Sequence, residues 1–255
     1  MSDVYKKLAE VTLAGRASVL CILTETKGST PRKAGSKMLV LDDGKIVGTI
    51  GGGSIEQRAQ KAAMKLMGCA NPEKLSFDLK DDLNMSCGGF AEVYLEPQNP
   101  KPRLVIFGAG HVGKALAEIA CKYGFSITLV DMREEALNEI SVEGAEKILG
   151  EYVEKATEIE TDNKTFVTIL TPKHISDEDV LAVMAKKTHL YLGMIGSKKK
   201  IASCKARFLK EKILTQNELD AIDMPIGIRF AAETPEEIAI SILARLIDVK
   251  NTSLQ

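Results

Sequence analysis

One stretch near the middle of the chain constrains the fold more than any other. Residues 104–131 read LVIFGAGHVGKALAEIACKYGFSITLVD. An apolar run typical of a buried strand leads into Gly108, Gly110 and Gly113, and a helix-forming stretch and a second apolar run then end in Asp131. The order of strand, glycine loop, helix and strand is that of a dinucleotide-binding unit. The sequence therefore predicts a Rossmann-like parallel sheet.

Each position of this motif has a chemical reason. Gly108 is expected to allow the tight turn, Gly110 to let the backbone approach a pyrophosphate, and Gly113 to let helix and strand pack closely. The helix N-terminus offers unpaired N–H groups to phosphate, and His111 is expected to face the same cleft. Asp131, 18 residues after Gly113, is placed to accept hydrogen bonds from a ribose. A carboxylate there repels a 2′-phosphate, and Arg133, two residues later, partly offsets this repulsion, so the motif moderately favours NAD over NADP.

The position of the motif predicts two domains, because 103 residues precede it. We expect an α/β protein with a smaller α+β domain over 1–96, a proline-rich linker PQNPKP at 97–102, and a Rossmann-like domain over 103–255. The first domain is predicted to hold helices 3–13 and 54–67 and strands 17–24, 37–41, 45–50 and 91–95. In the second, strands at 104–107, 127–130, 165–170 and 189–192 alternate with helices, which indicates a parallel sheet.

Composition narrows the function. The 34 Lys and Arg residues balance 35 Asp and Glu residues, for a net charge of −1, which argues against non-specific nucleic-acid binding. The apolar runs are too short to cross a bilayer, and the N-terminus is typical of an amphipathic helix rather than a signal peptide. Five scattered cysteines without CxxC pairs indicate a reducing compartment and neither a disulfide framework nor structural zinc. We therefore expect a cytoplasmic protein.

A second glycine loop lies in the first domain. Gly51, Gly52, Gly53 and Ser54 connect a predicted strand to a predicted helix. Consecutive glycines are costly in chain entropy, so the backbone there needs unusual dihedral angles or close contact with a ligand. An anion cradle at the helix start and a simple tight turn both fit this pattern.

Two further segments of the first domain carry suitable chemistry. The loop 28–37 (GSTPRKAGSK) contains Arg32, two lysines and several hydroxyls, which suit a phosphate or a polar heterocycle, although solvated loops often have this composition. Cys87 stands beside two glycines just before a strand. Its thiol is a candidate contact for a bulky ligand or a soft metal, while most lone cysteines are buried small residues.

The loop Gly193–Ser197 of the second domain follows a predicted strand and precedes three lysines, 198–200. Lysines in the first turn of a helix oppose its dipole, which favours an anion nearby. Because ligands bind at the carboxyl ends of parallel strands, Gly196 and Ser197 are candidate ligand contacts.

Six motifs in the same order resemble the XdhC/CoxI family, the maturation factors of molybdenum hydroxylases such as xanthine and carbon monoxide dehydrogenases. They are GSTPRKAGSKM, GGGSIE, SCGGFAEVYLEP, IFGAGHVGKALA with VDMR, YLGMIGSKKK and PIGIRFAAETPEEIAISILA. The resemblance implies a homodimer that binds the molybdenum cofactor (molybdopterin), protects it, assists its sulfuration by a cysteine desulfurase and delivers it to an apo molybdenum hydroxylase. TPKHISDED and GIRFAAET depart from the family pattern, which leaves the ligand of the second domain open.

The sequence thus favours an accessory protein without its own turnover. The predicted cofactor-binding residues are Arg32, Gly51, Gly52, Gly53, Ser54, Gly108, Gly110, His111, Gly113, Asp131, Gly196 and Ser197, with Cys87 as the metal contact and no catalytic residue. Two alternatives remain: an NAD-dependent oxidoreductase that uses His111 for proton transfer, and a sensor that only binds NAD. The chain lacks the Tyr-xxx-Lys spacing, HExxH, GxSxG and the P-loop, which speaks against the first alternative.

Overall fold

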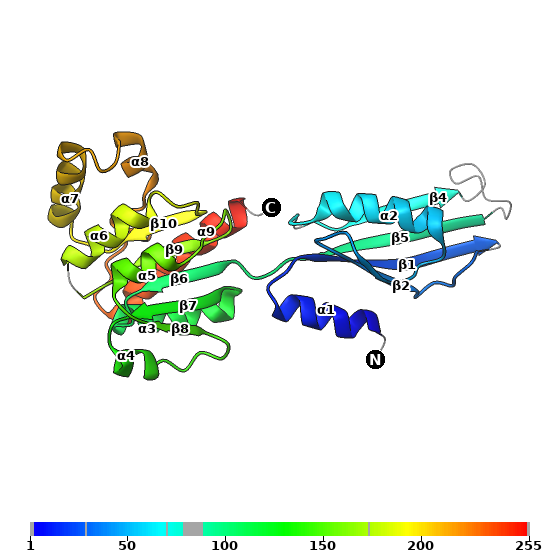
Figure 1. The fold of residues 1–255 in the computed structure, drawn as a ribbon, viewed down its shortest axis with the longest axis horizontal. Coiled ribbons are helices and arrows are strands. Elements are labelled where there is room, and N and C mark those ends of the chain that lie inside the picture. The colour runs from blue at the N-terminus through cyan, green and yellow to red at the C-terminus, as the bar shows by residue number, and fades with distance from the viewer. Residues whose placement is uncertain (1–2, 29, 70, 79–88, 173, 254–255) are drawn as a thin grey trace. The chain divides into compact units, whose positions relative to one another are not determined.

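The structure, a computed structural model, describes residues 3–28, 30–69, 71–78, 89–172 and 174–253. The chain divides into two compact units, one made largely of the residues up to Pro100 and the other of Lys101–Thr252. Figure 1 labels the elements of each unit.

The first unit is an antiparallel sheet with a helix on each face, in the strand order β3-β2-β1-β5-β4. Its elements are α1 (Asp3–Leu13), β1 (Ser18–Gly28), β2 (Lys37–Leu41), β3 (Ile46–Gly48), α2 (Gly53–Leu66), β4 (Glu73–Asp78) and β5 (Gly89–Gln98). Alternation along β1 explains the layers, because successive side chains of a strand point to opposite faces. Val19 and Cys21 belong to the core under α2, whereas Leu20 packs with Val4 and Val11 of α1. Figure 1 shows the two helices on opposite sides of this sheet.

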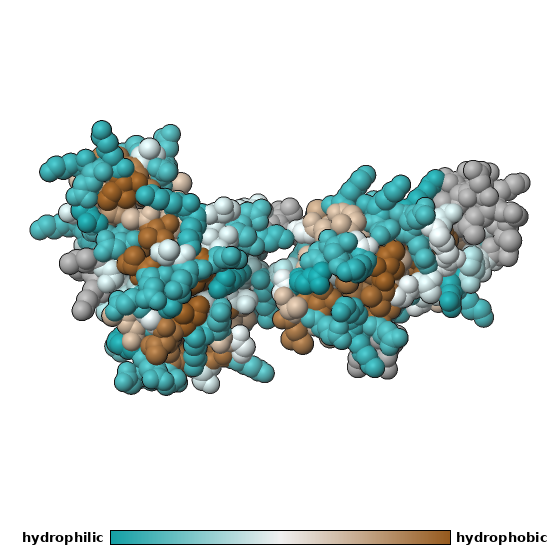
Figure 2. Space-filling view, viewed as in Figure 1, coloured by the Kyte–Doolittle hydropathy of each residue, from teal (hydrophilic) through white to brown (hydrophobic). Residues whose placement is uncertain are grey.

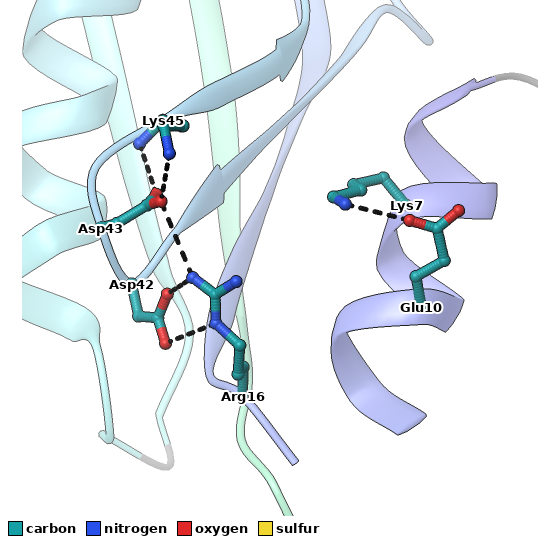
Figure 3. A network of polar contacts seen from close by, with 6 residues as sticks. All are labelled: Lys7, Glu10, Arg16, Asp42, Asp43 and Lys45. Carbon is teal, nitrogen blue, oxygen red and sulfur yellow. Dashed lines mark hydrogen bonds and ion pairs between the residues drawn. The ribbon is translucent and has the colours of Figure 1, made fainter. Parts of the chain in front are cut away.

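The sharp connection between β2 and β3 is supported by surface charges (Figure 3). Gly44 takes a φ of 79°, and the Lys45 backbone N–H donates to the Asp43 carboxylate over 3.0 Å, which closes the turn. Arg16, just before β1, donates to both oxygens of Asp42. These partly exposed pairs contribute little stability each, so they fix the shape of the turn more than they hold the sheet.

The predicted linker begins too early. Strand β5 extends to Gln98, and Pro97 lies opposite Val19 of β1. A proline is tolerated there because β4 pairs with β5 only as far as Leu95, so β5 has one hydrogen-bonded neighbour beyond that point. Asn99 is also tied to the first unit, since its amide donates to the Cys69 carbonyl over 2.6 Å.

The second unit is a Rossmann fold with a five-stranded parallel sheet in the order β10-β9-β6-β7-β8. The strands are β6 (Arg103–Phe107), β7 (Ser126–Asp131), β8 (Glu146–Leu149), β9 (Phe166–Ile169) and β10 (Tyr191–Met194). The helices are α3 (His111–Ala120), η1 (Cys121–Tyr123), α4 (Glu134–Asn138), α5 (Tyr152–Glu158), α6 (His174–Met184), α7 (Lys198–Lys210), α8 (Gln216–Ala221) and α9 (Pro235–Ser253). The fold class predicted from the sequence, a Rossmann-like domain after a smaller sheet domain, is confirmed.

Successive side chains of β6 again point to opposite faces of the sheet and so belong to different cores. Leu104 and Ile106 pack in the core beneath α3 and α9, whereas Val105 and Phe107 pack in the core beneath α5, α6 and α7. The order of the strands reverses between β6 and β9, and in such sheets ligands bind at the carboxyl ends of the strands beside this reversal.

The surface shown in Figure 2 carries apolar residues in small patches among polar ones. Among the described residues, the helices are all too short or too polar to cross a membrane.

Candidate cofactor-binding sites

A cleft of about 550 Å³ opens at the point where the strand order of the second unit reverses. Its walls come from the loops that follow β6, β7, β9 and β10, from α3 and α4, and from the first residue of α9. The lining residues are Ala109, Gly110, His111, Val112, Lys114, Arg133, Glu135, Ala136, Glu139, Leu170, Thr171, Pro172, Ile195 and Pro235. The cleft therefore holds His111 and the middle of the predicted glycine motif, as the sequence suggested.

The three glycines of the motif differ in what they do. Gly108 has a φ of 109°, and a Cβ there would lie 2.4 Å from the Leu170 carbonyl oxygen. A Cβ on Gly113 would lie 1.9 Å from the Gly108 carbonyl oxygen, so only glycine lets α3 approach β6 this closely. No described atom lies within 4 Å of a Cβ built on Gly110, which lines the cleft. The tight turn and the close packing are confirmed, and Gly110 leaves the approach to the helix N-terminus open.

Asp131 does not face the cleft with a free carboxylate. Its side chain is 0% exposed, and Oδ2 accepts the Ala109 N–H over 2.7 Å. Arg133 donates its backbone N–H and its Nε to Oδ1 and its Nη2 to Oδ2, each over 2.9 Å. The Tyr152 hydroxyl hydrogen-bonds the same carboxylate. Five donors saturate about four lone-pair positions, so the ribose contact predicted for Asp131 requires these partners to leave.

The ionisation of this group follows from those contacts. Burial alone would raise the pKa of Asp131, but the hydrogen bonds from Arg133 and Ala109 outweigh it and lower the pKa to about 2. Burial and the hydrogen bond to Asp131 raise the pKa of the Tyr152 phenol above its usual value. Asp131 is therefore a buried anion that holds the glycine loop and Arg133 in place.

A second buried acid lies behind the opposite wall of the cleft. Asp177 of α6 accepts the Thr171 N–H over 2.9 Å and the Thr171 hydroxyl over 2.6 Å, and Thr171 lines the cleft. The Lys200 ammonium donates to the same carboxylate over 2.5 Å, and the two side chains are 10% and 1% exposed. Lys200 thus neutralises an internal carboxylate, which explains a lysine in the first turn of α7 without an external anion.

Gly196 and Ser197 fulfil local roles at the start of α7. A Cβ on Gly196 would lie 2.9 Å from Ile201 Cδ1, and the Ser197 hydroxyl accepts the Lys200 N–H over 3.3 Å as the N-cap. Their neighbour Ile195 lines the cleft, but Gly196 and Ser197 are not among the lining residues. Their predicted ligand contacts stay predictions, and their observed contacts are those of a helix start.

In the first unit, the structure brings Arg32 and the triple glycine together. Gly51 and Gly52 have φ angles of 138° and 126°, and a Cβ on Gly51 would lie 3.7 Å from Arg32 Cβ. Gly52, Gly53 and Arg32 are exposed, as is Ser54. Among the residues that the structure describes, no atom lies within 4 Å of a Cβ built on Gly52 or Gly53. This loop therefore presents open backbone beside a cation at the start of α2.

Part of this loop is already occupied by Glu56, which the sequence analysis overlooked. Glu56 Oε1 accepts the Thr49 hydroxyl over 2.5 Å and the N–H groups of Ile50 and Gly52 over 3.2 and 3.3 Å. Burial opposes ionisation, but these hydrogen bonds outweigh it and lower the pKa of Glu56. The predicted cradle is thus half filled by an internal carboxylate, and the N–H groups of the first turn of α2 remain for a ligand.

Cys87, the predicted metal contact, lies outside the described residues. The described cysteines differ in accessibility: Cys21 and Cys204 are buried, whereas Cys69 is exposed. Burial raises the pKa of the Cys21 thiol to about 12 and that of Cys204 to about 11. Neither is a thiolate at neutral pH, so both are packing residues.

Glu56, Asp177 and Lys200 were not among the predicted site residues. Each makes its polar contact with a residue that is distant in the sequence or about one helical turn away. For Glu56 a signal existed, because an acid four residues after Gly52 can turn back to a helix start. For Asp177 and Lys200, which lie 23 residues apart, no local pattern indicates the pair.

With both sites described, the comparisons with known proteins identify the family. The XdhC Rossmann domain family matches residues 104–246, and the XdhC and CoxI family matches residues 12–78. The chain belongs to the XdhC/CoxI family, as its motifs indicated.

Three known proteins are similar to this chain over nearly its whole length. YqeB of Escherichia coli K12 is 34% identical over 98% of the chain, which spans 47% of the length of YqeB. The molybdenum cofactor insertion chaperone PaoD of the same organism is 22% identical over 94% of the chain and 86% of PaoD. A solved Bacillus halodurans structure described as a xanthine dehydrogenase shares the fold, with a TM-score of 0.54 and 24% identity over 99% of this chain and 97% of that one.

Proposed function

We propose that the protein is a maturation chaperone that binds the molybdenum cofactor, protects it and delivers it to an apo molybdenum hydroxylase of the xanthine dehydrogenase type. Membership of the XdhC/CoxI family and similarity to a chaperone that inserts this cofactor support the proposal. The protein acts in the cytoplasm as a homodimer, and a cysteine desulfurase supplies the sulfur ligand of the metal.

The observation that carries this proposal is the open loop beside Arg32. Molybdopterin ends in a phosphate, and a phosphate is recognised by unpaired N–H groups at a helix start together with a guanidinium. Gly52 and Gly53 leave room for it, and Arg32 packs against the neighbouring Gly51. In this proposal Cys87 contacts the metal or its sulfur, since molybdenum–sulfur chemistry favours a soft thiolate.

A delivery assay tests the function. Apo-hydroxylase is mixed with a limiting amount of isolated cofactor, with and without the full-length protein, and the activity that develops is measured. We expect the protein to raise the final activity, and the variant Cys87→Ser to raise it less than Cys69→Ser, which changes an exposed cysteine. Activity that is independent of the protein contradicts the delivery function.

The cleft of the second unit supports a second proposal, that this unit binds an adenine dinucleotide such as NAD. The glycine loop is intact in shape, and the cleft lies at the reversal of the strand order, where dinucleotides bind in this fold. Isothermal titration calorimetry with dinucleotides tests it. Binding that disappears in Gly110→Val supports the cleft, and the absence of binding by the folded wild type contradicts it.

A further inference from the structure

The end of β7 offers the cleft a cation rather than a free carboxylate. In this fold an acid at that position holds the ribose hydroxyls of NAD, whereas an arginine nearby accommodates the 2′-phosphate of NADP. Here Asp131 is 0% exposed and saturated by Ala109, Arg133 and Tyr152. The Arg133 side chain is 48% exposed and lines the cleft.

We propose that the cleft selects an adenine dinucleotide with a phosphate on the adenosine ribose, NADP rather than NAD, through Arg133, while Asp131 is a positioning residue that never touches the ligand. This reverses the preference expected from the sequence. It rests on the proposed dinucleotide binding and is independent of the molybdenum cofactor.

The geometry of Arg133 supports this role. A guanidinium has five N–H donors in a planar fork, and the Asp131 carboxylate engages Nε and Nη2 over 2.9 Å each. This contact orients the fork and leaves donors for the cleft. A phosphate gains charge-assisted hydrogen bonds from such a preoriented fork, whereas a neutral ribose hydroxyl gains much less.

The other charges of the cleft limit the size of the preference. Lys114 lies 3.7 Å from Glu139, so this pair is nearly balanced, and Glu135 also lines the cleft. Glu135 opposes an anion, which leaves Arg133 as the main source of discrimination. We therefore expect NADP to bind about tenfold more tightly than NAD at low ionic strength, and the ratio to fall as salt is added.

The test is calorimetric titration of the full chain with NAD, NADP, 5′-AMP and 2′,5′-ADP. The ratio of the two dinucleotide dissociation constants is the readout, and the two adenosine fragments locate the preference on the ribose phosphate. Arg133→Gln should bring the ratio close to one. Arg103→Gln is the matched control, because Arg103 also pairs with an acid but lies at the start of β6, at the other end of the sheet.

Arg133→Gln leaves a buried carboxylate without its partner, so the double variant Asp131→Asn with Arg133→Gln provides a folded alternative with both charges removed. Loss of the preference in this double variant supports the proposal, and a preference that survives in it refutes the role of Arg133. Equal binding of NAD and NADP by the wild type, or tighter binding of NAD, overturns the selectivity but leaves dinucleotide binding standing. If neither dinucleotide binds, both proposals fail.

Discussion

Removal of the Lys200 ammonium should destabilise the wall of the cleft more than any surface ion pair does. Lys200 and Asp177 are 10% and 1% exposed and 2.5 Å apart. Breaking a buried pair from one side costs about 3–5 kcal/mol, because the remaining charge has no counterion. Asp177 keeps two hydrogen bonds from Thr171, so we expect about 3 kcal/mol for Lys200→Met, at the lower end of that range.

The chain offers a matched control on the same helix. Lys205 lies 3.7 Å from Asp220, and these side chains are 30% and 59% exposed. Lys205→Met should therefore cost less than about 1 kcal/mol. The double variant Asp177→Asn with Lys200→Met removes both charges and should recover part of the loss, which measures the coupling between the two groups.

Hydrogen exchange followed by mass spectrometry measures these costs within α6 and α7 of the full chain. A loss of about 3 kcal/mol corresponds to exchange on the order of a hundredfold faster, since each 1.4 kcal/mol is about tenfold. If Lys200→Met accelerates exchange no more than Lys205→Met does, the buried pair does not stabilise this wall and the reasoning is refuted.

Three further variants test the local contacts. Glu56→Ala should weaken the start of α2 by about 1–2 kcal/mol at pH 7. Because hydrogen bonds lower the folded pKa of Glu56, this stabilisation is present above the ordinary pKa of 4.5 and is lost as the pH falls through the folded pKa. The hydrogen-exchange rates of the variant and the wild type should therefore converge in acid. Gly113→Ala should lower the melting temperature strongly, because its Cβ would lie 1.9 Å from a backbone oxygen, whereas Gly110→Ala, with open space, should melt close to the wild type; equal melting temperatures would contradict this packing. Asp131→Asn should lower the free energy of unfolding by about 2 kcal/mol at neutral pH, which corresponds to a pKa of about 2 against the usual 3.8. This stabilisation is present above pH 3.8 and is lost as the pH falls through about 2. Chemical denaturation that shows no cost at pH 7 would refute it.

Local sequence patterns predicted the helices and strands in which buried apolar positions recur with a regular period. The helix Asp3–Leu13 and the strand Lys37–Leu41 lie at the predicted residues, because their apolar positions follow one period and polar residues bound them. The glycine loop was predictable for a different reason, since the helix packing at Gly113 depends on the Gly108 carbonyl only five residues earlier.

Two strands were not predicted, and both lie at the edges of their sheets. Strand β4 (Glu73–Asp78) and strand β8 (Glu146–Leu149) are short and mostly exposed. Their polar composition is typical of a loop, and pairing with a single inner neighbour makes them strands. Edge strands gain their structure from that neighbour, which a local pattern does not contain.

The sequence predicted where the candidate sites lie, but not which charged groups they present to a ligand. The sequence placed Asp131 and His111 at one end of the sheet, which follows from the topology of alternating strands and helices. It did not reveal that Arg133 and Tyr152 close over Asp131, because Tyr152 comes from a helix 21 residues further along the chain. Side-chain pairing of this kind depends on tertiary structure, and it decides what the site offers to a ligand.

Binding of the molybdenum cofactor is tested by measuring the molybdenum and pterin content of the purified protein. The wild type and two variants are isolated from a molybdenum-replete host. Gly53→Val adds a side chain to the open loop at a glycine whose φ is not positive, and Gln57→Val places the same side chain on the exposed part of α2. We expect the wild type and Gln57→Val to carry equal amounts of molybdenum and pterin, and Gly53→Val to carry little of either with its fold intact. Wild-type protein without molybdopterin, or equal cofactor on all three proteins, would contradict it.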